Sequence, residues 1–144
     1  MKETSSGKDV GVVLVTHTDY GSRLLQAAEF ILGPQQGCVS VSVDGSREVA
    51  EMVAELKDSV NASDQGGGVL MLTDMFGGTP TNLSLSLLGS RQLEVVTGVN
   101  LPMLLKVLGS RKTPLEQLAR DAKLAGTQGI VVAGELLRKR VGGS

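Results

Sequence analysis

The only histidine of the chain, His17, follows a mostly apolar run and lies four residues before Gly21. Residues 10–16 predict a buried strand, and a helical pattern begins near Ser22, just after Gly21. In open α/β folds, ligands bind at the carboxyl ends of the parallel strands, where each strand leads into a helix. Imidazole has an unperturbed pKa of about 6.5, so one of its nitrogens is available as a nucleophile near neutral pH. His17 is therefore the candidate for histidine chemistry.

Asp74 follows a second apolar run, residues 69–73, which predicts a strand buried on both faces. Loops after the strands of a parallel sheet emerge at one edge, so we expect His17, Asp74 and the loop 98–100 to meet there. A carboxylate can accept a hydrogen bond from one ring nitrogen, which fixes the tautomer and leaves the other nitrogen as the nucleophile. We therefore predict that Asp74 orients His17.

A glycine-rich helix start follows Asp74. Thr79 is predicted to be the N-cap of a helix with Pro80 at its first position, and Gly77 and Gly78 precede it. A helix N-terminus carries about half a positive charge and favours phosphate oxygens. A nucleophilic imidazole, an orienting carboxylate and an anion cradle together indicate a phosphoryl-acceptor site. Spacing alone leaves open that each of these residues is an ordinary strand end, turn or cap.

The elements that must position these residues alternate between strands and helices. Strands are predicted at 10–16, 38–43, 69–73, 93–97 and 130–133, with amphipathic helices between them; the last of these helices opens with a capping box at 113–116. This order predicts a three-layer α/β domain with a five-stranded, mostly parallel sheet and helices on both faces. We place the domain at 10–134, between a flexible segment at 1–9 and a tail at 135–144. The pattern does not decide the direction of the short last strand.

Composition excludes several classes of function. Lys and Arg number 14 against 15 Asp and Glu, a net charge of −1, which argues against a nucleic-acid surface. The cluster Arg138–Arg140 is interpreted as a solvated tail. Cys38 is the only cysteine and is expected to be a small buried hydrophobe; together with the lack of a signal-peptide pattern, this predicts a cytoplasmic chain. The apolar runs fall short of the ~20 residues that cross a bilayer, so no membrane insertion is expected.

The sequence contains neither of the glycine-rich nucleotide-binding motifs G-x-x-x-x-G-K-[ST] and G-x-G-x-x-G, so we predict no cofactor. One His and one Cys cannot form a zinc site, so we also predict no metal. Aromatic residues are rare, yet Tyr20 and Phe76 flank the candidate site. Their position indicates either a recognition surface or caps on the edge of the core.

Four blocks of the sequence carry a resemblance to a known family. They are residues 12–17 (VVLVTH), 27–33 (AAEFILG), 72–82 (LTDMFGGTPTN) and 97–104 (TGVNLPML). In this combination, the chain resembles the IIA component (EIIA) of the mannose-type family of the bacterial phosphoenolpyruvate:sugar phosphotransferase system. The resemblance covers about residues 10–134.

The resemblance implies that His17 accepts phosphate from phospho-HPr and passes it to a histidine or cysteine of an EIIB component, with Asp74 as the orienting carboxylate. Gly77, Gly78 and Thr79 would bind the phosphate. The surface that meets the partner proteins would comprise Tyr20, Met75, Phe76 and Asn100. The family sheet has four parallel strands and a fifth, antiparallel strand that two subunits of a homodimer exchange, so residues 130–133 would be that strand.

The chain departs from the family pattern after the histidine, where Thr18, Asp19 and Tyr20 replace small residues. Asp19 would place a negative charge near an incoming phosphate unless it points into solvent. Two alternatives stay open: a regulatory module whose phosphorylation of His17 reports the state of the system, and the phosphoryl-transfer subunit of dihydroxyacetone kinase. The block 98–103 favours the mannose-type family over the second. The sugar cannot be determined from these residues.

Overall fold

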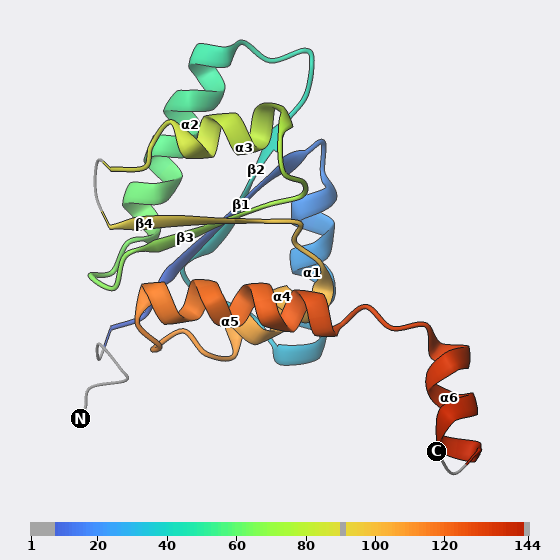
Figure 1. The fold of residues 1–144 in the computed structure, drawn as a ribbon. Coiled ribbons are helices and arrows are strands. Elements are labelled where there is room, and N and C mark those ends of the chain that lie inside the picture. The colour runs from blue at the N-terminus through green and yellow to red at the C-terminus, as the bar shows by residue number, and fades with distance from the viewer. Residues whose placement is uncertain (1–7, 90–91, 143–144) are drawn as a thin grey trace.

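Four parallel strands form the central sheet of the chain (Figure 1). The computed structural model describes residues 8–89 and 92–142. Its strands are β1 (Gly11–His17), β2 (Cys38–Val43), β3 (Val69–Thr73) and β4 (Leu93–Thr97), and they lie in the order β2-β1-β3-β4. The two central strands are almost entirely buried, whereas β2 and β4 form edges that are partly exposed. The expected α/β fold with a parallel sheet is confirmed.

Helices cover both faces of this sheet (Figure 1). They are α1 (Tyr20–Leu32), α2 (Val49–Ser63), α3 (Gly78–Leu85), α4 (Leu101–Leu108), α5 (Leu115–Gln128) and α6 (Ala133–Val141). Successive residues of β1 face opposite layers, since side chains point to the two faces of a strand in turn. Val12 and Leu14 pack in the core under α4 and α5, while Val13 and Val15 pack in the core under α2.

Two predicted helix starts are wrong in detail. Helix α3 begins at Gly78 with Gly77 as its N-cap, so Thr79 is not the cap, and it ends at Leu85. Both glycines have positive φ angles, 89° and 83°, which let the chain turn into the helix before Thr79. Helix α5 has Pro114 at its N-cap position and no side-chain cap, so the expected capping box does not form.

The predicted fifth strand does not form within this chain. Residues 130–132 have no strand structure, and Ala133 begins α6. This segment leaves the body after α5 and projects away from it (Figure 1), so within a single chain it meets no strand edge to pair with. The large apolar side chains of this segment stay exposed, with Ile130 at 75%. The predicted segment 1–9 lies mostly outside the described residues.

The structure agrees with the expected inert role of Cys38. The thiol is half-buried, and burial raises its pKa to about 12, so it stays protonated at neutral pH. In the described ranges no helix has the length and apolarity to cross a membrane.

Helix α1 lies very close to the sheet at Gly21, directly after the candidate site. The backbone N–H of this glycine donates to Oγ1 of Thr16 over 2.8 Å. A Cβ at Gly21 would lie 2.7 Å from Oγ of Ser40 and 3.2 Å from Cβ of Leu14. Only glycine therefore allows this approach, which sets where α1 begins relative to His17.

We predict that Gly21→Ala lowers the free energy of unfolding by about 1–3 kcal/mol, because the added methyl group overpacks the contact with the side chains of Thr16, Ser40 and Leu14. Urea denaturation measures this change. The matched control is Ser22→Ala, whose side chain is exposed. Equal stability of the two variants would contradict the close packing of α1.

Candidate functional site

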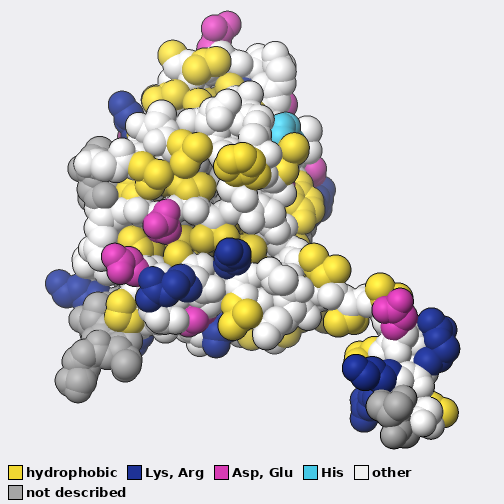
Figure 2. Space-filling view, viewed as in Figure 1, with side chains coloured by type: hydrophobic (Ala, Val, Ile, Leu, Met, Phe, Trp, Pro, Cys, Tyr) yellow, Lys and Arg dark blue, Asp and Glu magenta, His cyan; other side chains and the backbone are white. Residues whose placement is uncertain are grey.

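The parallel pairing of β1 and β3 brings His17 and Asp74 together. Val15 of β1 lies opposite Thr73 of β3, so both strands end at the same edge of the sheet. Nδ1 of His17 lies 2.9 Å from Oδ2 of Asp74, and the backbone N–H of His17 donates to the same oxygen over 2.9 Å. The histidine side chain reaches the surface, where it is visible in Figure 2. The predicted pair is therefore formed.

This hydrogen bond determines the tautomer of the imidazole. An ionised carboxylate can only accept, so Nδ1 of His17 carries the proton and Nε2 of the neutral ring has a free lone pair. Gly78 lies next to this atom, since a Cβ there would be 3.6 Å from Nε2. Nε2 thus faces the glycine-rich start of α3, where backbone N–H groups and the helix dipole favour an anion.

Asp74 is held in its ionised form. Partial burial raises the pKa of its carboxyl group, but hydrogen bonds from the backbone and ring of His17 outweigh this effect, so the pKa lies below its ordinary value. A lowered pKa means that this pair stabilises the fold above the ordinary carboxyl pKa. The contribution is lost as the pH falls through the lowered value. Oδ1 of Asp74 is buried and has no hydrogen-bond partner among the described residues.

The backbone directly after His17 is strained. Thr18 has a φ of 48°, which is rare for a β-branched residue and costs about 1–3 kcal/mol. Its N–H donates to the carbonyl of Val43 over 2.8 Å, which holds the chain in this turn. Asp19 is exposed and pairs with Arg23 at 3.3 Å, so its charge is partly balanced on the surface of α1. This pairing reduces the electrostatic repulsion that we expected between Asp19 and an incoming anion.

Sequence reasoning missed the residue that shapes the loop after Asp74. Thr81 is buried, and its hydroxyl donates to the carbonyl of Met75 over 2.6 Å. The same hydroxyl lies 2.8 Å from Oγ1 of Thr73, which is also buried. This network ties the first turn of α3 to the end of β3 and so fixes the loop that carries Asp74. The sequence signal for this network was the hydroxyl residue Thr73 at the end of an apolar strand.

The residues predicted to meet a partner divide into two groups. Met75 and Phe76 are exposed, Phe76 at 81%, on the loop next to His17. Tyr20 is partly exposed, but its hydroxyl donates to the carbonyl of Val99 and ties α1 to the loop after β4. Asn100 caps α4: its Oδ1 accepts from the N–H of Met103 over 3.0 Å, and its amide donates to Gly126. An Asn before a Leu-Pro pair is an N-cap signal that sequence reasoning did not use.

Thr79 is exposed at the start of α3, next to Gly78. Its hydroxyl is therefore open to a ligand at the helix N-terminus, although the residue does not cap the helix. Within the part of the chain that the structure describes, no group of three or more His, Cys, Asp or Glu side chains could hold a metal ion.

Comparison with known proteins identifies the family to which this chain belongs. The sequence model of a family described as "PTS system fructose IIA component", where PTS is the phosphoenolpyruvate:sugar phosphotransferase system, matches residues 11–123. The fructose-specific EIIA component of Bacillus subtilis (strain 168) is 28% identical over 132 residues, which cover 90% of each chain. The mannose-specific EIIAB component of Escherichia coli (strain K12) is 27% identical over 124 residues, and the match spans 38% of that protein.

Solved structures share the fold. The mannose/sorbose-specific IIA subunit from Enterococcus faecalis superimposes with a TM-score of 0.79 at 24% identity, over 86% of this chain and 94% of that one. An EIIA component from Streptococcus agalactiae gives the same TM-score at 25% identity, over 88% and 98%. The family match spans most of the chain, including both His17 and Asp74. This chain therefore belongs to the mannose-type EIIA family of the bacterial phosphotransferase system.

Proposed function

We propose that this chain is a phosphocarrier that accepts a phosphoryl group on Nε2 of His17 and passes it to a second protein. The single observation that carries the proposal is the 2.9 Å hydrogen bond between Nδ1 of His17 and Oδ2 of Asp74, which leaves Nε2 open beside Gly78. Components of this family act as phosphotransferases. The donor is phospho-HPr and the acceptor an EIIB component, as membership of the family implies.

The transfer needs no proton to leave the attacking nitrogen. The lone pair of Nε2 forms the new N–P bond, and the electron pair of the broken P–N bond stays on the donor's ring nitrogen. The ring of His17 gains positive charge during this step, which the ionised Asp74 balances at Nδ1. Backbone N–H groups of Gly77 and Gly78 and the hydroxyl of Thr79 bind the phosphoryl oxygens. Transfer to the acceptor reverses these steps.

A protein surface for this exchange surrounds His17. Met75 and Phe76 extend into solvent beside the imidazole, and large exposed apolar side chains next to a reactive group are typical of docking surfaces. Tyr20 and Asn100 complete the rim, where they hold the loops at the ends of β1 and β4 in place.

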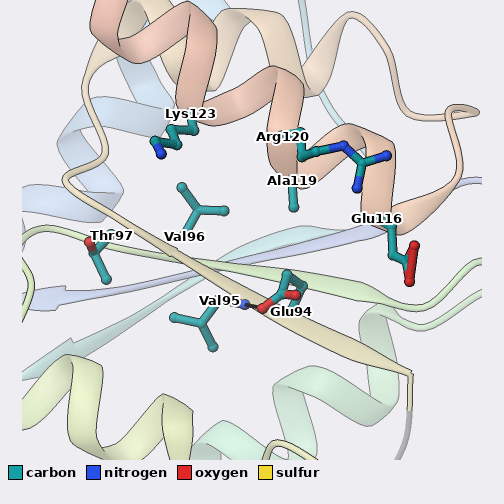
Figure 3. A pocket seen from close by; sticks show the side chains of 8 residues that line it. All are labelled: Glu94, Val95, Val96, Thr97, Glu116, Ala119, Arg120 and Lys123. Carbon is teal, nitrogen blue, oxygen red and sulfur yellow. Dashed lines mark hydrogen bonds between the residues drawn. The ribbon is translucent and has the colours of Figure 1, made fainter.

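We further propose that the chain forms a homodimer in which residues 130–133 of each copy pair, antiparallel, with β4 of the other copy. The outer edge of β4 has no strand partner in the described chain. A groove of about 590 Å³ runs between this edge and α5 (Figure 3). Ile130, Val131 and Val132 are exposed and β-branched, so they suit a strand and would be covered in such a groove.

We predict that incubation with phosphoenolpyruvate, Enzyme I and HPr adds one phosphoryl group to the chain, detected by intact-mass analysis and lost at acid pH. His17→Ala abolishes the gain, because the chain has no other histidine. Acid-labile phosphate on this variant would contradict the assignment of His17. No gain on the unchanged chain with its cognate donor would contradict the proposed function.

Asp74→Asn is expected to slow phosphorylation by about 100-fold or more, since the amide cannot balance the charge of the ring and no longer selects one tautomer. Rapid-quench kinetics measure the rate, and ¹⁵N NMR of the imidazole reports the tautomer. Asp19→Asn is the matched control, as Asp19 is a neighbouring carboxylate that pairs with Arg23 instead. Equal rates for both variants would remove Asp74 from the mechanism.

Deletion of residues 129–144 is expected to convert the dimer to a monomer, because it removes the strand that covers the β4 edge. Analytical ultracentrifugation measures the mass, and circular dichroism checks that the body remains folded. A truncated protein that stays dimeric would argue against the exchange of residues 130–133.

A further inference from the structure

The free edge of β4 is occupied by a side chain of its own strand. The carbonyl of Gln92 points toward β3, where it accepts from the N–H of Val69. The backbone N–H and C=O groups of every second residue from 93 onward therefore point to the outer edge of the sheet. The N–H of Val95 is one of these outward groups. It donates to Oε1 of Glu94 over 2.9 Å. The carboxylate thus satisfies a backbone donor that any added strand needs.

The end of the groove that contains Glu94 is acidic. Figure 3 shows Glu94 and Glu116 near one end and Lys123 near the other, beside Thr97. Glu116 makes no hydrogen bond or ion pair within the described ranges. Arg120 also lies at the acidic end, but its guanidinium donates to the side chain of Gln117 rather than to a carboxylate. Strand addition would displace Glu94 from the N–H of Val95 and leave a half-buried carboxylate in need of a cation.

Helix α6 carries the complementary charge. Its last turn contains Arg138, Lys139 and Arg140, against a single acidic residue in its first turn, Glu135. None of its residues is buried, and Figure 2 shows these basic side chains gathered on the projecting end of the chain. Leu137 and Val141, four residues apart, share one exposed side of the helix. Nothing described in this chain covers that side.

The direction of the exchanged strand links the two surfaces. An antiparallel segment 130–133 enters the groove at the Thr97 end and leaves it at the Glu94 end, where α6 begins. Arg138–Arg140 follow within two helical turns, about 10 Å.

We propose that α6 of one copy docks on the acidic end of the β4 groove of the second copy, where its basic last turn pairs with Glu94 and Glu116. In this arrangement Glu94 exchanges the N–H of Val95 for a cation of the partner copy. Helix α6 is then a lock on the exchanged strand rather than a solvated tail. This inference rests on the strand exchange proposed above.

The test is a charge swap in the full-length chain. We expect Glu94→Lys with Glu116→Lys to weaken the dimer by about tenfold or more, and reversal of Arg138, Lys139 and Arg140 to Glu to weaken it similarly. Combining both sets restores the dissociation constant to within about threefold of the unchanged chain. Sedimentation velocity over a dilution series measures these constants. Glu48→Lys with Glu51→Lys is the control, because it makes the same change in net charge at exposed positions at the start of α2, where Glu48 is the N-cap residue and Glu51 lies in the first turn.

Three results would overturn the inference, and they separate it from the dimer itself. A dimer that is unaffected by both swaps but lost on deletion of residues 129–144 removes α6 docking and keeps the strand exchange. A chain that is monomeric throughout the series removes both. If reversal of the α6 charges leaves the dimer intact but abolishes sedimentation with vesicles of phosphatidylcholine and phosphatidylglycerol, α6 binds an anionic lipid surface instead.

Discussion

The parallel pairing of β1 with β3 is the constraint on which the site depends. Val15 lies opposite Thr73, so the residues two and one positions later, His17 and Asp74, leave the sheet side by side. The 2.9 Å hydrogen bond between them follows from this register. A shift of one residue in either strand would turn its side chains to the opposite face and separate the pair. The buried apolar cores on both faces hold the register in place.

The surroundings of this pair are rigid, although its imidazole is exposed. Thr18 occupies a strained conformation that a hydrogen bond to the carbonyl of Val43 maintains, and Thr81 fixes the loop after Asp74 through the carbonyl of Met75. In the proposed phosphoryl transfer His17 must be accessible to partner proteins, yet its ring must not reorient between encounters. The structure separates these needs, since the rigidity lies in the backbone around the ring and the exposure lies at Nε2.

The edge of β4 contrasts with the buried centre of the sheet. An unpaired strand edge invites association, and proteins protect such edges with charged side chains or with a covering segment. Here Glu94 satisfies the N–H of Val95 while the apolar segment after α5 projects into solvent. In the proposed dimer a second copy completes the sheet, so assembly depends on the region that follows α5 and not on the site at His17.

The sequence by itself determined the alternation of strands and helices, the position of His17 at a strand end, and Asp74 as its partner, because apolar periodicity and the parallel-sheet rule depend on local pattern. It did not determine that Gly77 rather than Thr79 precedes α3, since that depends on two positive φ angles. The contact of Thr81 with the carbonyl of Met75 and that of Asn100 with the carbonyl of Gly126, 26 residues away in sequence, were decided only by the fold. The local sequence pattern could not determine the secondary structure of residues 130–133, because a strand forms only where another strand edge is available to pair with it.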